Sequence, residues 1–232
     1  MGVESETGNA MARPLNKRQL ADAVAHLRAR DAAFVPILDY VGPCAFEART
    51  DHFTALADII AAQQVSKYAA VSIRQKLRDR YGDPIDLAKI ARARDEGLRA
   101  CSLSGAKITS LREIARAVVR GEFDFATLDA LDDAAAIERL VALKGIGRWT
   151  AEIYLMFVLG RPDIFPIGDV ALRKLMRQVY GLAEDAPPPA YLAVAEAWAP
   201  YRTVASWYLY AWINRRRAEA RRVNAGMPET LV

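Results

Sequence analysis

Apolar residues in this chain recur at intervals of three and four positions, which is the spacing of one face of an α-helix. The first such segment carries Leu20, Val24 and Leu27, and Asn16 precedes it as a candidate N-cap. Strict alternation of apolar and polar residues, the pattern of a half-buried strand, is scarce. The pattern therefore predicts an all-α fold.

The same periodicity, with its Gly and Pro breaks, predicts a series of further helices. They cover residues 53–64, 66–81, 86–93, 96–101, 108–119, 132–143, 149–160, 168–181, 191–197 and 202–223. Two stretches that contain prolines, residues 36–43 and 187–189, are interpreted as connectors. Residues 1–13 are interpreted as a disordered tail and residues 14–232 as one helical domain. No long linker divides that domain, so any second body must share its helices with the first.

Composition limits the class of protein. The chain has 232 residues, of which 53% are hydrophobic and 26% charged, and this balance favours a folded core over general disorder. No apolar run reaches the roughly 20 residues of a membrane span. The first residues are polar and acidic, unlike a signal peptide. We therefore expect a cytoplasmic protein without a membrane partner.

Cysteine content and charge narrow the possibilities further. Cys44 and Cys101 are the only cysteines, and two thiols form neither a disulfide framework nor the four-ligand set of an iron–sulfur cluster. The net charge is +4 and the pI is about 9.1, which favours anionic partners. Arginines crowd the C-terminal end, either as a solvated face or as a surface for DNA: Arg215, Arg216, Arg217, Arg221 and Arg222.

The most informative stretch is residues 140–151, which read Leu-Val-Ala-Leu-Lys-Gly-Ile-Gly-Arg-Trp-Thr-Ala. A predicted helix ends at Leu143, two glycines flank Ile146, and a new helix begins at once. Gly145 and Gly147 permit positive φ and close backbone approach. Exposed amides of the turn and of the next helix can bind a phosphate oxygen. A tight turn between two packed helices is the plainer alternative.

A second feature lies further along the chain. Residues 164–174 place Asp169 at the start of a predicted helix, shortly after Pro166. Aspartate is a favoured N-cap, so from these residues alone a purely structural role for Asp169 is preferred.

The two features together resemble the helix-hairpin-helix/Gly-Pro-Asp superfamily of base-excision DNA glycosylases, most closely its 3-methyladenine DNA glycosylase II (AlkA-type) branch. In that family a hairpin of the form Leu-Pro-Gly-Ile-Gly-x-x-Thr-Ala is followed, at the spacing found here, by a Pro and a catalytic Asp. Residues 59–66 resemble the family's Gln-containing loop, and residues 200–210 resemble a segment of its last helix. The resemblance covers about residues 50–215.

The resemblance implies two helical subdomains, one of about residues 51–160 and the other from the N- and C-terminal helices. It places the hairpin and an active-site cleft between them. Asp169 would stabilise the charge that develops on the sugar and would orient or deprotonate water. Four aromatic residues are candidates for the pocket of the flipped base, with core packing as the alternative for at least two: Trp149, Tyr154, Trp207 and Tyr210.

The hairpin and the Gln-containing loop also imply DNA contacts. The implied DNA-binding residues are Lys144, Gly145, Ile146, Gly147, Arg148, Thr150, Gln63 and Gln64. Gln64 maps to the side chain that fills the gap left by the flipped base. The hairpin carbonyls of Val141, Leu143 and Ile146 map to the family's site for a monovalent or similar cation, and no other cofactor is implied.

Departures from the family pattern define the branch. Trp149 stands where bifunctional relatives carry the lysine that forms a Schiff base with the sugar, so no lyase step is expected. Lys144 replaces the usual hairpin proline. The cysteines of the cluster-containing branches are absent.

We therefore predict a monomeric, monofunctional glycosylase, associated with the nucleoid if bacterial. It would excise alkylated bases from double-stranded DNA by base flipping and hydrolysis of the N-glycosidic bond. A glycosylase for deaminated or oxidised bases and a non-catalytic DNA-binding module remain the alternatives. A helix-turn-helix regulator is disfavoured, because Gly-Ile-Gly suits phosphate contact better than major-groove readout.

Overall fold

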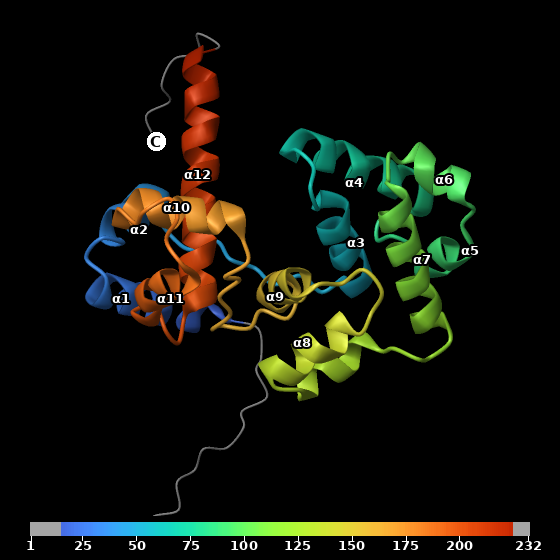
Figure 1. Cartoon of the computed structure of the whole chain (residues 1–232), viewed down its shortest axis with the longest axis horizontal. Helices are drawn as coiled ribbons and strands as arrows, with labels where there is room; N and C mark the ends of the chain where they lie inside the picture. Colours follow the sequence, from blue (N-terminus) through green and yellow to red (C-terminus); the bar gives the residue numbers. More distant parts are fainter. Residues whose placement is uncertain (1–14, 225–232) are drawn as a thin grey trace, which may run out of the picture. The chain divides into compact units, whose positions relative to one another are not determined.

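A computed structural model describes residues 15–224, and within that range the chain is helical and has no strand (Figure 1). The predicted all-α fold is confirmed. The described residues divide into two compact units, one of residues 49–159 and one of residues 15–48 with 160–224. The N-terminal tail predicted for residues 1–13 lies outside the described residues.

The first unit is built around a central apolar helix, α3, which packs against α4, α7 and α9. Leu56, Ile60 and Ala61 on α3 are buried. Helices α5 and α6 pack on α7, and α8 packs on α9. The elements of this unit are α3 (His52–Ala62), α4 (Lys67–Tyr81), α5 (Leu87–Arg92), α6 (Asp95–Ala100), α7 (Gly105–Val119), the 3₁₀ helix η1 (Phe125–Ala130), α8 (Asp133–Val141) and α9 (Arg148–Phe157).

The second unit packs around α12, which contacts α1, α2 and α10. Its core contains the fully buried Trp198, whose ring centroid lies 5.6 Å from that of Phe34. Asp31 accepts hydrogen bonds from the Trp198 indole at 2.9 Å and from the Tyr180 hydroxyl at 2.5 Å. The helices of this unit are α1 (Lys17–Arg30), α2 (Val35–Val41), α10 (Val170–Tyr180), α11 (Pro188–Glu196) and α12 (Arg202–Asn224).

Side-chain caps explain where several helices begin. Asn16 caps α1 in a reciprocal capping box with Gln19, as its position in the sequence suggested. Ser66 caps α4 and Ser104 caps α7, and each side chain accepts a hydrogen bond from a backbone amide of the first turn. Asp132 does the same for α8. The starts of these helices are therefore set locally.

Two interpretations of proline were wrong. Residues 36–43 were expected to connect helices, but α2 runs through most of them with Pro36 in its first turn. Pro188 and Pro189 likewise form the first turn of α11. Proline is tolerated there because the first helical amides have no intrahelical acceptor. Among residues 15–224, no helix has the length and apolar content needed to cross a bilayer.

Candidate active site and nucleic-acid interface

The hairpin lies between α8, which ends at Val141, and α9, which begins at Arg148. Ile146 is only 4% exposed and anchors the turn in the core of the first unit, while its amide donates to the Leu143 carbonyl at 3.1 Å. Gly145 has a φ of +85°. A Cβ on Gly145 would lie 1.8 Å from Ser110 Oγ on α7. Glycine at this position is therefore required by both conformation and packing.

Gly147 has different surroundings. Its φ is −90°, which any residue adopts, and a Cβ there would meet nothing within 4 Å. Gly147 is also the N-cap of α9, which no side chain caps. Gly147, Lys144 and Arg148 are all exposed. The end of the turn and the start of α9 thus form an open surface with positively charged side chains on both sides.

The Gln-containing loop between α3 and α4 is held from two sides. Gln63 donates from Nε2 to Thr150 Oγ1 at 2.9 Å, which ties the loop to the first turn of α9. The Lys107 ammonium donates to the carbonyls of Ala61 and Gln63 at 2.9 and 2.8 Å. Burial lowers the pKa of Lys107. The hairpin and the loop therefore belong to one hydrogen-bonded framework.

These contacts give the two glutamines different roles, and they show that Thr150 is buried and bonded within the protein. Thr150 is 2% exposed, and its hydroxyl is used by Gln63. Gln64 is exposed and has a φ of +52°, a conformation that is uncommon for a residue with a side chain. Gln64 is thus the exposed residue of the pair, and Gln63 supports the loop.

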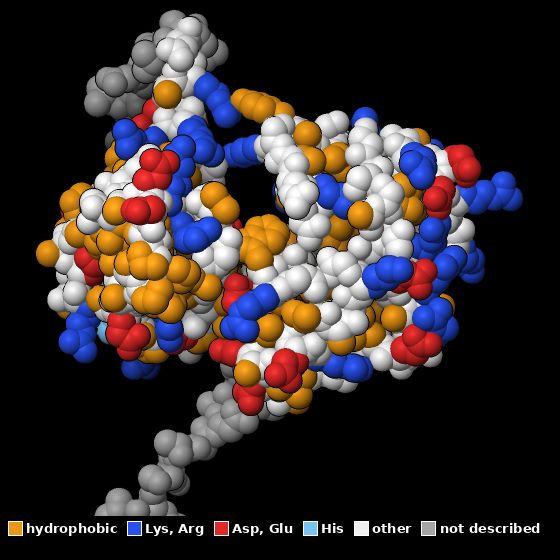
Figure 2. Space-filling model, viewed as in Figure 1, with side chains coloured by type: hydrophobic (Ala, Val, Ile, Leu, Met, Phe, Trp, Pro, Cys, Tyr) orange, Lys and Arg blue, Asp and Glu red, His pale blue; other side chains and the backbone are white. Residues whose placement is uncertain are grey.

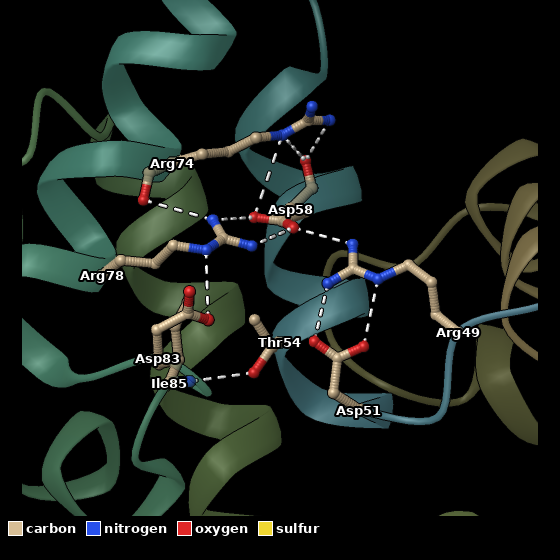
Figure 3. Close-up of polar contacts among 8 residues, drawn as sticks. All are labelled: Arg49, Asp51, Thr54, Asp58, Arg74, Arg78, Asp83 and Ile85. Carbon is tan, nitrogen blue, oxygen red and sulfur yellow. Dashed lines mark hydrogen bonds and ion pairs between the residues drawn. The ribbon is translucent and has the colours of Figure 1, made fainter.

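A buried ionic cluster fixes the angle between α3 and α4 (Figure 3). Asp58 on α3 is 4% exposed and accepts hydrogen bonds from Arg49 at 2.7 Å and from both terminal nitrogens of Arg78 at 2.7 and 2.9 Å. Arg74 donates to the Asp58 backbone carbonyl. Burial raises the pKa of Asp58, but the bonds from Arg78 and Arg49 outweigh that effect and leave its pKa below the usual range.

Sequence reasoning missed this cluster and Lys107. A lone Asp in the apolar helix α3 was the available signal, because a buried carboxylate requires a partner. Its partners lie 9, 16 and 20 positions away. Only the packing of the helices brings these residues together.

Asp169 lies in the second unit, at the start of α10. It is 8% exposed, and its Oδ1 accepts the Leu172 amide at 2.7 Å, so Asp169 is the N-cap of α10. Burial and the negative charge of Asp169 raise the pKa of the Tyr210 phenol on α12. The Tyr210 phenol therefore stays protonated beside the Asp169 side chain. The structure thus brings together two of the predicted site residues, Asp169 and Tyr210.

The other aromatic candidates differ in exposure. Tyr154 is fully buried, and its hydroxyl lies 2.7 Å from His52 Nδ1, with Phe125 stacked beside both rings. Those contacts are typical of a core residue. Trp149 and Trp207 are half-buried. Trp207 lies one helical turn before Tyr210 and meets the ring of Tyr208 edge-on at 5.0 Å.

The carbonyls that the resemblance maps to a cation lie at the C-terminal end of α8 and in the hairpin turn after it. Carbonyl groups in the last turn of a helix have no intrahelical donor, which suits a cation. The Leu143 carbonyl already accepts the Ile146 amide, so one of its lone pairs is used. Among the described residues, no group of three or more His, Cys, Asp or Glu side chains is arranged to hold a metal ion.

The fold matches that of one known class of proteins. Residues 57–200 match the family model described as the HhH-GPD superfamily of base excision DNA repair proteins. The chain belongs to this superfamily.

Individual proteins of the superfamily are similar to this chain over most of their length. It is 33% identical over 197 residues to "DNA-3-methyladenine glycosylase 1" of Schizosaccharomyces pombe, covering 82% of this chain and 86% of that protein. The solved structure of the S. pombe 3-methyladenine DNA glycosylase with abasic DNA has a TM-score of 0.75 and 31% identity, covering 82% of this chain and 95% of that chain. A DNA-3-methyladenine glycosidase from Bacillus halodurans has a TM-score of 0.68 and 34% identity, covering 82% and 87%.

Proposed function

We propose that this chain is a monofunctional DNA glycosylase that releases alkylated bases, such as 3-methyladenine, from double-stranded DNA in base excision repair. The observation that carries the proposal is the buried Asp169 carboxylate, which accepts the Leu172 amide and lies beside the Tyr210 phenol. The relatives named above, described as 3-methyladenine glycosylases and covered over most of their length, support the substrate class.

The chemistry follows from the charge that the reaction creates. As the N-glycosidic bond breaks, positive charge develops at C1′ of the sugar, and an ionised carboxylate beside it stabilises the transition state. The same carboxylate orients or deprotonates the attacking water. A base alkylated at a ring nitrogen is already cationic, so it leaves without a general acid.

DNA binding is assigned to the hairpin and the loop of the first unit. In this proposal a backbone phosphate approaches the open face at Gly147, between Lys144 and Arg148. Contacts of this kind hold the duplex without reading its sequence. Gln64 enters the space left by the flipped nucleotide, and Gln63 holds the loop through Thr150. A monovalent cation on the carbonyls of Val141, Leu143 and Ile146 would brace the turn.

The base pocket is assigned to the half-buried aromatic residues of the second unit, Trp207 and Tyr210. Trp149, on α9 of the first unit, stays a candidate that only the resemblance supports. An electron-rich ring face attracts a cationic base more strongly than a neutral one. Tyr154 supports α9 from within the core. We further propose that the protein acts as a monomer, without an iron–sulfur cluster, in the compartment that holds the genome.

The decisive test is Asp169→Asn. Asparagine caps a helix about as well as aspartate, so α10 should remain stable. It carries no negative charge, and we expect release of free 3-methyladenine from a methylated duplex to fall at least on the order of 10²–10³-fold. An unchanged melting temperature would show that the loss is chemical. Full activity in the Asn variant would leave Asp169 as a helix cap only and would overturn the proposal.

The same assay, run over a panel of alkylated, deaminated and oxidised bases, defines the substrate range. Preferential release of the alkylated purines is the expected result. Release of uracil or an oxidised purine at a higher rate would assign the site to another lesion class. Tight DNA binding with no release of any base would identify a non-catalytic module.

A further inference from the structure

The C-terminal half of α12 carries a dense group of arginines that the proposed function does not use. Residues 211–224 contain five arginines and a single acidic residue, Glu219. Figure 2 shows Lys and Arg side chains gathered along this part of the helix. Arg215, Arg216, Arg217, Arg221 and Arg222 are all exposed.

One side of this segment is anchored to α2. Arg215 donates to the Tyr40 carbonyl at 2.8 Å, and its guanidinium lies 5.2 Å from the centre of the Tyr40 ring. Glu219 accepts a hydrogen bond from the Tyr40 hydroxyl and pairs with Arg215 at 3.4 Å. Residues 215 and 219 are four positions apart and share one helix face. These contacts fix which way the segment faces.

A different face of α12 begins beside the proposed catalytic carboxylate and continues toward the C-terminal end of the helix. Helix α12 packs against α10, and its Tyr210, beside Asp169, lies seven residues before Arg217 and eleven before Arg221. At 3.6 residues per turn, these separations are almost two and three whole turns, so the three residues share one face. Arg215 and Glu219 lie well away from that face. Trp207, one turn before Tyr210, continues the row in the opposite direction.

The spacing of this row matches a DNA backbone. With a rise of about 1.5 Å per residue, Arg217 and Arg221 lie ~10 and ~16 Å along the helix from Tyr210. Successive phosphates of one strand are about 3.4 Å apart along the duplex axis, so these distances correspond to roughly three and five nucleotides. A duplex that runs alongside this face of α12, with its damaged nucleotide at Asp169, would therefore present phosphates to both guanidinium groups.

We propose that Arg217 and Arg221 form a second phosphate-binding site, which grips the duplex backbone several nucleotides from the flipped base. This inference rests on the proposed function, because that function brings DNA to Asp169. It adds a contact in the unit that carries the catalytic carboxylate, separate from the hairpin. The two arginines bind phosphates without reading sequence, so they strengthen binding to any flanking duplex.

The test compares two double variants with the same loss of charge on the same helix. In Arg217→Gln/Arg221→Gln the proposed site is removed. In Arg216→Gln/Arg222→Gln the two lost charges lie on other faces of α12. Binding to a duplex that extends a full helical turn on each side of the lesion is measured by anisotropy from about 50 to 200 mM salt. Equal melting temperatures confirm that both variants fold.

The first variant should bind about tenfold or more weakly near 0.1 M salt, and the slope of log K against log salt should fall by about two. The control variant should lose much less. On a duplex truncated beside the lesion, the first variant should bind like the wild type. An unchanged slope, or an equal loss of affinity in both variants, would overturn the proposal. Either result is expected if the arginines bind an acidic protein or only face solvent.

The readouts also keep the two proposals apart. Failure of the wild type to release any base would contradict the proposed function. Binding of an undamaged duplex by the two double variants would still decide whether this face of α12 contacts DNA.

Discussion

Gly145 and Gly147 lie two residues apart in the hairpin turn but are glycines for different reasons. Gly145 has positive φ and touches Ser110, whereas Gly147 has an ordinary φ and faces open space. The sequence motif indicated that both were needed and attributed both to backbone freedom and close approach. It could not separate them, because the contact that constrains Gly145 comes from α7, 35 positions earlier in the chain.

This difference predicts that alanine changes the stability of the protein at one position and hardly at the other. Gly145→Ala should lower the free energy of unfolding by at least about 2 kcal/mol, because a Cβ at positive φ is strained and overlaps Ser110. Gly147→Ala should leave that free energy within about 1 kcal/mol, since lower chain entropy offsets a poorer N-cap. The added methyl group stands where the phosphate approaches, so DNA binding should weaken.

Denaturant unfolding and duplex binding, measured on both variants, check this pair. If Gly147→Ala bound DNA as tightly as the wild type, phosphate contact at that amide would be ruled out. If Gly145→Ala were as stable as the wild type, the close contact with Ser110 would not constrain the turn.

Asp169 illustrates what residue type alone can establish. From the sequence it was interpreted as either an N-cap or a catalytic carboxylate, and the structure confirms the cap. The two roles are compatible, since the N-cap bond uses Oδ1, one of the two carboxylate oxygens. The neighbour that favours the catalytic role is Tyr210, on a helix 41 positions later. Tyr210 was selected as a pocket residue from the resemblance, but its place beside Asp169 could not be foreseen.

Among the elements, α3 and α4 present the Gln-containing loop at a fixed angle. Their positions were well predicted from apolar periodicity, and the Ser66 cap sets the start of α4. The ion pairs that link the two helices were not predicted. In the sequence, Arg49, Arg74 and Arg78 cannot be distinguished from arginines that face solvent. Helix α2 was missed for a related reason, since Pro36 reads as a break unless its place in the first turn is known.

Asp58→Asn tests the ionic cluster. The substitution removes the carboxylate that Arg49 and Arg78 share and leaves them with Asp51 and Asp83 as ion partners. It should lower the free energy of unfolding by about 2–3 kcal/mol. The loss is smaller than for a fully buried pair because Arg49 and Arg78 remain partly hydrated. DNA binding should weaken as well, because α3 and α4 no longer hold the loop at one angle.

The pH dependence of this loss gives a second check. Because the folded pKa of Asp58 is lowered, its stabilising contribution is complete above the unfolded pKa of about 3.9 and is lost as pH falls through the folded value. The difference in unfolding free energy between wild type and Asp58→Asn should therefore be constant near neutral pH and shrink below about pH 4. A difference that did not change with pH would show that the charge of Asp58 contributes nothing.

At the scale of the whole molecule, the residues of the proposed function are divided between the two units that the chain forms. The hairpin and the loop belong to the first unit, and Asp169, Tyr210 and the arginine row of α12 belong to the second. The order of motifs along the sequence was enough to predict the family, because the hairpin and the carboxylate occur at a recognisable spacing. Tyr210, Arg217 and Arg221 share one face of α12. That shared face indicates a DNA contact only because the fold places Tyr210 beside Asp169.

The products of the whole reaction give the last prediction. Trp149 occupies the position at which bifunctional relatives carry the Schiff-base lysine, and an indole cannot form that bond. The products should therefore be free base and an intact strand with an abasic site. Incubation with a methylated duplex should give no strand break until alkali is added, and borohydride should trap no protein–DNA adduct. The alkali-induced break confirms that the base was released, so an intact strand before alkali cannot be mistaken for inactivity. A nick without alkali, or a trapped adduct, would mean that another amine of this chain reaches C1′ and that the enzyme is a lyase.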